Sequence, residues 1–503
     1  MSEILDVVIV GAGLSGIGTA CHLKRNCPDR SFVVLERRAA SGGTWDLFRY
    51  PGIRSDSDMY TLGYNFKPWE EGKAIADGPS ILKYVRETAT EHGIDSLIEY
   101  EQHVKDANWD SDAQCWVLNI LVGADETPRE LRTRFLMSCA GYYKYDHGYQ
   151  PDFPGREQFT GEFIHPQHWP EDLDYSDKKV VIIGSGATAV TLLPALAEKA
   201  ADTVMLQRSP TWMVSRPSSD WLANLLRTIL PSSWAYALTR FKNTMFQHWL
   251  YRRSRRTPEK VREMLFKGLR RSLGTAAESQ MEHFTPSYDP WDQRMCLVPD
   301  DDLFEAIREG KGRIVTAEIE EILPRGIRLK SGEQLDADII VSATGLEMEI
   351  LGGVQIAVDG EPFDVPASWA YRGMMFSGLP NLLAVFGYIN ASWTLRADLC
   401  ASWLCDLLNH MQDKGVAVVT PTLEDSLDEM EPRPYIDDFS AGYMRRVMHR
   451  FPKQGDRDPW INSQRFLLER KQFSEMNFDE EALRYESLKC AAEGSSESLE
   501  QAA

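Results

Sequence analysis

The sequence predicts an α/β protein with two doubly wound dinucleotide-binding domains and a helical insert. Three observations lead to this fold class. The chain has 503 residues, which is too long for one compact core. A buried strand, a glycine-rich loop and a helix follow one another at the start of the chain and again near residue 180. Helical periodicity rich in arginine then interrupts the second of these units.

We expect the first domain to be built from two separate parts of the chain. These parts are residues 1–141 and 338–490, and residues 142–337 form a linker and the second domain. The helical insert is expected at about 212–287. Residues 491–503 are small and polar, so a disordered tail is expected there.

Composition narrows the class of protein. The net charge of −20 favours solubility and argues against nucleic acid as the main partner. None of the eight cysteines forms a C-x-x-C pair or joins histidines at zinc-ligand spacing, so we expect free thiols and no metal. The acidic N-terminus is not a signal peptide, and no apolar run approaches the roughly 18–20 residues of a membrane span. A cytoplasmic protein is expected.

The first nucleotide unit begins with the β-branched run Asp6–Val10. In the loop that follows, Gly11 permits a tight turn, Gly13 lets the backbone approach a pyrophosphate, and Gly16 lets helix and strand pack closely. The helix N-terminus then holds the phosphate charge. The next strand ends in Glu36, where a carboxylate accepts hydrogen bonds from a ribose diol. This Rossmann-like unit predicts FAD or NAD.

The second unit has a G-x-G-x-x-A loop at Gly184–Ala189 but a different end to its second strand. Gln207 and Arg208 stand there in place of an acid. An acid would repel a 2′-phosphate, whereas an arginine can bind one bidentately. The second unit therefore predicts NADP, and the pair of units indicates a flavoprotein that takes hydride from NADPH.

A reduced flavin passes its electrons to a disulfide, to another carrier or to oxygen. Cys400 and Cys405 are the closest cysteine pair, and their spacing differs from that of a redox-active C-x-x-C. No iron–sulfur or haem pattern is present. Oxygen remains, and the protein is then an oxidase or a monooxygenase.

The stretch between the two glycine loops, Phe159–Pro170, reads as a loop by spacing alone, and a structural linker is its simplest interpretation. It nevertheless fits the pattern F-x-G-x-x-x-H-x-x-x-W-P, which resembles the fingerprint of type I Baeyer–Villiger monooxygenases. The segments Gly42–Trp45 and Arg49–Asp56 also resemble the flavin-site loop of that family. The residues that fill the fingerprint are Phe159, Gly161, His165, Trp169 and Pro170.

The resemblance implies a two-stage reaction. NADPH reduces FAD, oxygen adds to give a C4a-peroxyflavin, and a ketone substrate becomes an ester or lactone; thioethers and thiocarbonyls are also oxidised. Arg294 would stabilise the negative charge without titrating, and Asp56 would orient it. From the residues alone, Arg294 could instead form a surface ion pair with Asp289 or Asp292, and Asp56 could be a solvated turn residue.

Two alternatives to this function remain at the level of sequence. One is an N- or S-hydroxylating flavin monooxygenase, against which Trp169 and Pro170 argue because that fingerprint differs at its end. The other is a non-catalytic flavoprotein scaffold, which would have lost loop glycines or Arg294. The fingerprint itself is expected to be the joint on which the NADP domain swings, with His165 as a positioning residue.

The glycine motifs and the resemblance together give the expected cofactor contacts. Gln293 stands where family members often have lysine, so Arg208 and Arg54 are expected to carry more of the NADP binding. The expected FAD contacts are Gly11, Gly13, Ser15, Gly16, Glu36, Thr44, Trp45, Asp46, Asp56 and Val104. The expected NADP contacts are Arg54, Ser55, Gly184, Ser185, Gly186, Ala187, Thr188, Ala189, Gln207 and Arg208.

The insert is strongly basic within an acidic protein. Its simplest interpretation is a helical core with a solvated face. The alternative is a peripheral attachment to anionic lipid, which would make the protein membrane-associated. The basic residues of its second half are Arg252, Arg253, Arg255, Arg256, Lys260, Arg262, Lys267, Arg270 and Arg271.

Overall fold

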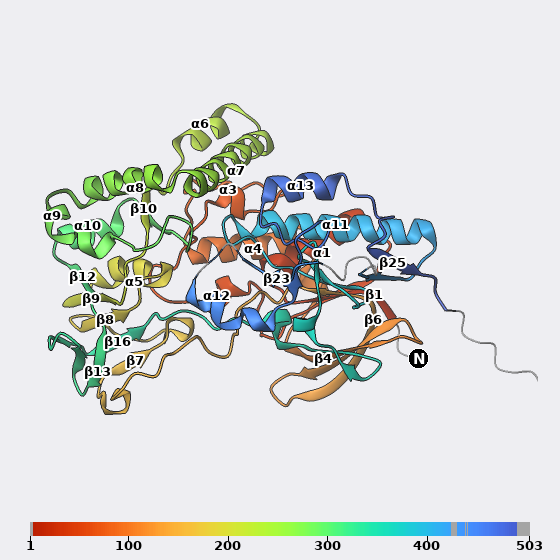
Figure 1. Cartoon of the computed structure of the whole chain (residues 1–503), viewed down its shortest axis with the longest axis horizontal. Helices are drawn as coiled ribbons and strands as arrows, with labels where there is room; N and C mark the ends of the chain where they lie inside the picture. Colours follow the sequence, from red (N-terminus) through yellow and green to blue (C-terminus); the bar gives the residue numbers. More distant parts are fainter. Residues whose placement is uncertain (1–3, 424–429, 438, 440, 490–503) are drawn as a thin grey trace, which may run out of the picture.

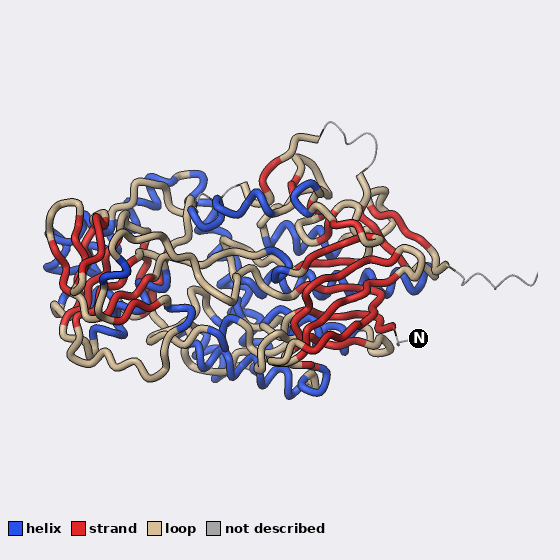
Figure 2. Tube along the Cα trace, turned by 90° about the horizontal axis from the view of Figure 1, so that it is seen from below, coloured by secondary structure: helices blue, strands red, loops and turns tan. Residues whose placement is uncertain are grey.

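The computed structural model describes residues 4–423, 430–437, 439 and 441–489. Two α/β lobes lie at opposite ends of the long axis, and a group of helices lies along one side of both (Figure 1). Seen from below, the strands gather into two separate groups with loops and helices between them (Figure 2). The expected tail at 491–503 falls outside the described residues.

The first lobe is built on a nine-stranded sheet. Its central strand pairs in parallel with a neighbour on each side, and Val7, Val8 and Ile9 are fully buried there. Helices α1 (Leu14–Asn26) and α11 (Trp393–Lys414) pack against each other in this lobe. In spatial order the strands are β18 (Glu361–Pro362), β17 (Gln355–Val358), β4 (Gln102–Asp110), β5 (Cys115–Val122), β6 (Thr127–Ser138), β1 (Ile4–Val10), β2 (Phe32–Leu35) and β3 (Ile98–Glu99), with β21 (Leu382–Ala384) also on β6.

The second lobe is a five-stranded parallel sheet. Two such sheets confirm the predicted fold class. The strands in spatial order are β12 (Gly312–Thr316), β9 (Asp202–Gln207), β8 (Lys179–Ile183), β16 (Ile339–Ser342) and β7 (Glu162–Ile164).

One expected domain boundary is wrong. Strand β16 follows the boundary predicted between 337 and 338, yet it pairs with β7 and β8 and so belongs to the second lobe. A fully buried strand reads as the same apolar run in either sheet, so periodicity could not assign it. The chain returns to the first lobe only after Gly345.

The insert forms four helices, α6 (Trp221–Ile229), α7 (Ser232–Arg256), α8 (Pro258–Leu273) and α9 (Ala277–Gln280). Asp220 caps α6 by accepting the N–H groups of Leu222 and Ala223 at 3.1 Å each. Helix α7 packs on the first lobe, where Arg240 Nη1 donates to the Gly63 carbonyl at 2.7 Å. Helix α8 packs instead on α10 (Asp302–Arg308) of the second lobe. The insert therefore bridges both lobes.

Among the described residues, no helix combines the length and apolar character that crossing a membrane requires. The cysteines described by the structure are buried free thiols, and Cys490 lies outside that part of the chain. His, Cys, Asp and Glu side chains do not gather into a metal-binding group anywhere in the described residues.

Candidate active site

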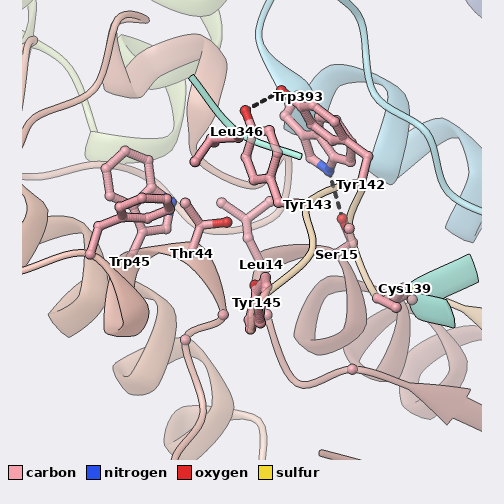
Figure 3. Close-up of a pocket in the computed structure, with 18 of the residues that line it drawn as sticks. Leu14, Ser15, Thr44, Trp45, Cys139, Tyr142, Tyr143, Tyr145, Leu346 and Trp393 are labelled. Carbon is pink, nitrogen blue, oxygen red and sulfur yellow. Dashed lines mark hydrogen bonds between the residues drawn. The ribbon is translucent and has the colours of Figure 1, made fainter. Parts of the chain in front are cut away.

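A cavity lies between the two lobes, and both nucleotide units contribute to its wall. Figure 3 shows Thr44, Trp45, Tyr142 and Trp393 around the same space. The predicted site residues that line it are Gly11, Gly13, Ser15, Glu36, Thr44, Trp45, Arg54, Ser55, Asp56, Val104, Ala187, Thr188 and Arg294. The predicted residues outside this wall are Gly16, Asp46, Gly184, Ser185, Gly186, Ala189, Gln207 and Arg208.

The first glycine loop needs its glycines because other backbone atoms lie too close to them for a side chain. Gly11 has φ +101°, and a Cβ on it would lie 2.7 Å from the Cys139 carbonyl oxygen. A Cβ on Gly16 would lie 1.8 Å from the Gly11 carbonyl oxygen, so Gly16 shapes the loop without reaching the cavity. Ser15 is held from the other side, because Trp393 Nε1 donates to its Oγ at 2.8 Å (Figure 3).

Glu36 is buried at the end of β2, with 5% of its surface exposed. Its carboxylate accepts the backbone N–H groups of Ala12 at 2.8 Å and Arg38 at 2.9 Å. Burial raises the pKa of this carboxyl, and the two backbone donors oppose the rise. An acceptor fixed beside the loop in this way fits the ribose diol of FAD.

The flavin-site loop divides its residues between two tasks. Thr44 and Trp45, which begin α2 (Thr44–Leu47), line the cavity. The Asp46 side chain is 3% exposed and turned away from the cavity into ion pairs. It holds the loop in place, and these contacts do not favour its predicted contact with FAD. Its partners are Arg38 and Arg86 at 2.7 Å each and Arg49 at 3.0 Å.

The second glycine loop repeats the geometry of the first. Gly184 has φ +144°, and a Cβ on it would lie 2.3 Å from the Ala343 carbonyl oxygen. A Cβ on Gly186 would meet nothing within 4 Å, which leaves room for a phosphate beside the loop. Helix α5 (Ala187–Ala197) begins there, and its N-terminal residues line the cavity. Ser185 bonds to Thr211, and Ala189 is fully buried against the sheet.

The two residues at the end of β9 point in different directions. The Gln207 side chain is buried and donates from Nε2 to the His283 carbonyl at 2.8 Å and to Thr316 Oγ1 at 2.9 Å. Its predicted contact with NADP stays a prediction, which these internal bonds do not favour. Arg208 is exposed, and within the described part of the chain it forms no ion pair. Its guanidinium is therefore available to a phosphate.

Arg54 and Ser55 lie where the two lobes meet. Arg54 lines the cavity and forms a bidentate ion pair with Asp302, at the start of α10 in the second lobe. Ser55 is buried, and its Oγ accepts the backbone N–H of Ser57 at 2.9 Å. The predicted role of Arg54 in NADP binding would require it to exchange this ion pair for the cofactor.

Arg294 and Asp56 face each other in the cavity, with Nε and Oδ2 3.7 Å apart. Burial disfavours the charge on Arg294, but Asp56 and Tyr142 outweigh burial and raise its pKa further above its usual range. Burial also disfavours the charge on Asp56 and so raises its pKa, while the positive charges of Arg294 and Arg54 oppose that rise. The arginine is therefore a permanent cation in this site.

The alternative partners of Arg294 are occupied elsewhere. Asp289 pairs with Arg262 and Asp292 with Arg255, each at 2.5 Å. The solvated turn considered for Asp56 is also not found, because this side chain is only 21% exposed. The tertiary structure thus selects the Arg294–Asp56 pair among the possibilities that the sequence left open.

Sequence reasoning missed Tyr142 and Tyr143 on the aromatic side of the cavity. Tyr142 and Tyr143 share a hydrogen bond between their hydroxyls, and the Tyr142 ring stacks on Trp393 with centroids 4.8 Å apart (Figure 3). Burial raises the pKa of Tyr142, so its hydroxyl stays protonated beside Arg294. Tyr388 also lines the cavity and donates to the buried Glu469 at 2.6 Å. The one available signal was that Tyr142 and Tyr143 directly follow an Ala-Gly turn.

The fingerprint stretch forms hydrogen bonds to both segments through which the chain passes between the lobes. Strand β7 is an edge of the second sheet, and η3 (Pro166–His168) follows it. His165 donates from Nε2 to the Gly345 carbonyl at 3.1 Å and accepts the Gln167 N–H at Nδ1 at 3.2 Å. The Gln167 amide donates to the carbonyl of Lys144 at 2.8 Å. Residues 144 and 345 belong to the outgoing and returning linkers.

Each remaining fingerprint residue has a packing contact. A Cβ on Gly161 would lie 2.1 Å from the Asp338 carbonyl oxygen, so only glycine fits beside β16. Trp169 is 9% exposed in the core of the second lobe, and Phe159 packs on a neighbouring cluster. Pro170 is exposed and its carbonyl accepts the Leu173 N–H at 3.3 Å. These contacts agree with the expectation that the stretch positions rather than catalyses.

Two dinucleotide units that face one cavity define a flavoprotein that a nicotinamide nucleotide reduces. Residues 69–268 match the model of the family described as flavin-binding monooxygenase-like, and residues 9–69 match an NAD(P)-binding Rossmann-like domain. The chain is 49% identical to the FAD-containing monooxygenase EthA of Mycobacterium tuberculosis over 96% of this chain and 98% of that protein. It is 46% identical to the probable FAD-binding monooxygenase AlmA of Acinetobacter baylyi over 97% of each chain.

Solved structures share the fold. A steroid monooxygenase bound to NADP superimposes with a TM-score of 0.78 at 20% identity, covering 96% of this chain and all of that one. OTEMO in complex with FAD and NADP gives a TM-score of 0.74 at 19% identity and the same coverage. The chain belongs to the flavin-binding monooxygenase family. It is an NADPH-dependent flavin monooxygenase with FAD and NADPH as cofactors.

Proposed function

We propose that this monooxygenase carries out Baeyer–Villiger oxidation of a ketone to an ester or lactone, and that it also oxygenates thioethers and thiocarbonyls. The observation that carries the proposal is the Arg294–Asp56 pair, at 3.7 Å, in a cavity lined by both nucleotide loops. Ketone oxidation develops negative charge on oxygen, first on the attacking group and then on the tetrahedral adduct. A fixed cation stabilises both.

Each residue of the pair has its own task in this proposal. FAD, once reduced by NADPH, supplies the electrons that activate oxygen. Arg294 presents N–H donors and a charge that no physiological pH removes. Asp56 holds the guanidinium in the cavity and limits its net field. Tyr142 and Trp393 wall off one side of the cavity from water.

The experiment compares Arg294→Ala with wild type, using FAD-loaded protein, NADPH, oxygen and a panel of ketones and thioethers. We expect NADPH oxidation and FAD content to persist while oxygenated product falls by about 100-fold or more. The matched control is Arg262→Ala, which removes a nearby arginine that pairs with Asp289 outside the cavity. A normal yield of ester or sulfoxide from Arg294→Ala would contradict the proposal.

We also propose a cytoplasmic protein that attaches reversibly to an anionic membrane surface through α6 and α7. The largest exposed apolar side chains gather there, including Trp221 at 75% and Trp234 at 68% exposure. Helices α6–α8 carry twelve basic residues and two acidic ones in a chain whose net charge is −20. Apolar side chains beside basic ones are the pattern of an interfacial helix.

Vesicle co-sedimentation tests the attachment. We expect binding to vesicles that contain anionic phosphatidylserine, weaker binding to neutral phosphatidylcholine, and release at high salt. Trp221→Ser combined with Trp234→Ser should weaken the binding while NADPH oxidation is unchanged. Absence of binding to anionic vesicles at low salt would end this proposal.

A further inference from the structure

We call the cavity that both nucleotide units line the flavin cavity. A second cavity, of about 550 Å³, lies beside it. Its walls come from α7 of the insert, from α13 (Phe466–Ser474) and from the loop before α11. Figure 1 shows α13 next to α7 on the same side of the molecule. Ala391 lines both this cavity and the flavin cavity, so the two cavities are neighbours.

One end of the second cavity adjoins the catalytic loops. Gln247 lines it and donates from Nε2 to Thr61 Oγ1 at 3.2 Å, and Thr61 bonds to Ser392 Oγ at 2.7 Å. Ser392 is the neighbour of Ala391 in the loop that borders the flavin. Gln247 Oε1 is buried and has no partner, which leaves one polar atom in the wall unused.

The lining of the second cavity is also basic. Among the residues that line the cavity there is no Asp or Glu. Arg255 pairs with Asp292 at 2.5 Å, and Lys471 pairs with Glu475 at 3.9 Å. The basic lining residues are His248, Arg252, Arg255, Arg256, Arg465 and Lys471.

Three of these arginines have no compensating carboxylate. Arg252, Arg256 and Arg465 are exposed and form no ion pair with any residue that the structure describes. Burial, together with the charges of Arg252 and Arg465, lowers the pKa of His248, as expected in a positive field. Like charges held together cost free energy, so a bound anion would stabilise this arrangement.

Part of the wall is apolar. Leu395, Phe466 and Leu467 line it, and Tyr251 adds an aromatic ring. From Gln247 to Arg256 the helix α7 advances nine residues, which is about 14 Å. An alkyl chain of about this length can lie along the apolar part of the wall.

We propose that this cavity binds an anionic amphiphile, with its carboxylate at Arg252, Arg256 and Arg465 and its alkyl chain along α13. The substrates of the proposed ketone oxidation are then keto carboxylic acids with an apolar chain. The statement about substrates rests on the proposed function, whereas the statement about binding does not.

Binding is tested on the FAD-loaded enzyme without turnover, by calorimetry with dodecanoate and with its methyl ester. We expect dodecanoate to bind more tightly, and Arg252→Gln or Arg465→Gln to weaken it about tenfold each while leaving the ester unchanged. The matched control is Arg253→Gln. Arg253 is next to Arg252 on α7, but its guanidinium lies 5.5 Å from the Trp249 ring centroid and it does not line the cavity.

Turnover is then compared for a linear keto acid and its methyl ester. We expect a lower KM for the acid, and an increase in that KM in Arg252→Gln and Arg465→Gln but not in Arg253→Gln. If the variants lose dodecanoate binding but neither they nor the wild type convert any ketone, the site is supported and the ketone oxidation is refuted. Equal binding of acid and ester, or equal behaviour of all three variants, would overturn the site. The FAD content of each variant verifies that it is folded.

Discussion

The two nucleotide units share one scaffold and differ in charge at the end of their second strand. In both, the first glycine of the loop has positive φ and lies against the carbonyl of the residue that follows a neighbouring parallel strand, Cys139 after β6 and Ala343 after β16. At the end of the second strand, the first unit has Glu36, which accepts two backbone N–H groups. The second unit has Gln207, whose amide is turned inward, followed by the exposed Arg208.

This difference shows which part of the motif carries specificity. The first two glycines of each loop serve a phosphate, which all dinucleotides have, so both units keep them. The ribose end differs among cofactors, and there the sign of the charge changes from acidic to basic. The chain thus assigns FAD to one unit and NADPH to the other with a few side chains rather than with a different fold.

The largest expected effect is that of Glu36→Gln. The glutamine amide would place its own donors against the N–H groups of Ala12 and Arg38, and it would lose the charged acceptor for the ribose. We expect FAD affinity to fall about 100-fold, measured as flavin content and by fluorescence titration. Glu99→Gln, on the neighbouring strand β3, serves as the control. Full flavin occupancy in Glu36→Gln would refute the assignment.

The next largest effect concerns Arg208, at the end of the second strand of the second unit. Arg208→Ala should lower kcat/KM for NADPH by about 10-fold or more, because a charge-assisted contact with the 2′-phosphate is lost. The value for NADH should change little. Arg313→Ala is the control, because Arg313 lies on the adjacent strand β12 and pairs with Asp202. An equal loss for both nucleotides would show that Arg208 does not read the phosphate.

The smallest effect concerns the joint between the two units. His165→Gln should cost about 1 kcal/mol of stability above pH 7 through altered hydrogen bonds to Gly345 and Gln167. It should also raise peroxide release relative to product more than it raises KM for NADPH. A peroxide yield equal to that of wild type would argue against a positioning role.

The same variant tests the pKa of His165, which burial lowers. A histidine with a lowered folded pKa is protonated first in the unfolded chain, so wild type loses stability as pH falls below the unfolded value of about 6.5. The variant has no such group. The difference in Tm between wild type and His165→Gln should therefore shrink from pH 7.5 to pH 5, and a constant difference would contradict the shift.

By itself, the sequence determined the features that depend on a few neighbouring residues. The two strand–loop–helix units, the acid and arginine that separate their cofactors, and the helical insert all follow from local rules of backbone conformation and periodicity. The family resemblance added the fingerprint and the prediction that Arg294 is the catalytic arginine. Glu36, Arg208 and the loop glycines are found where these rules predict them.

Only the tertiary structure decided which distant groups meet. Arg294 could have paired with Asp289 or Asp292, which are five and two residues away in the sequence, yet it faces Asp56 from another lobe. Asp46 is taken up by three arginines, and β16 joins the second sheet rather than the first. The physical reason is that ion pairs and buried strands have many equivalent partners in sequence. Packing of the whole chain selects one of them.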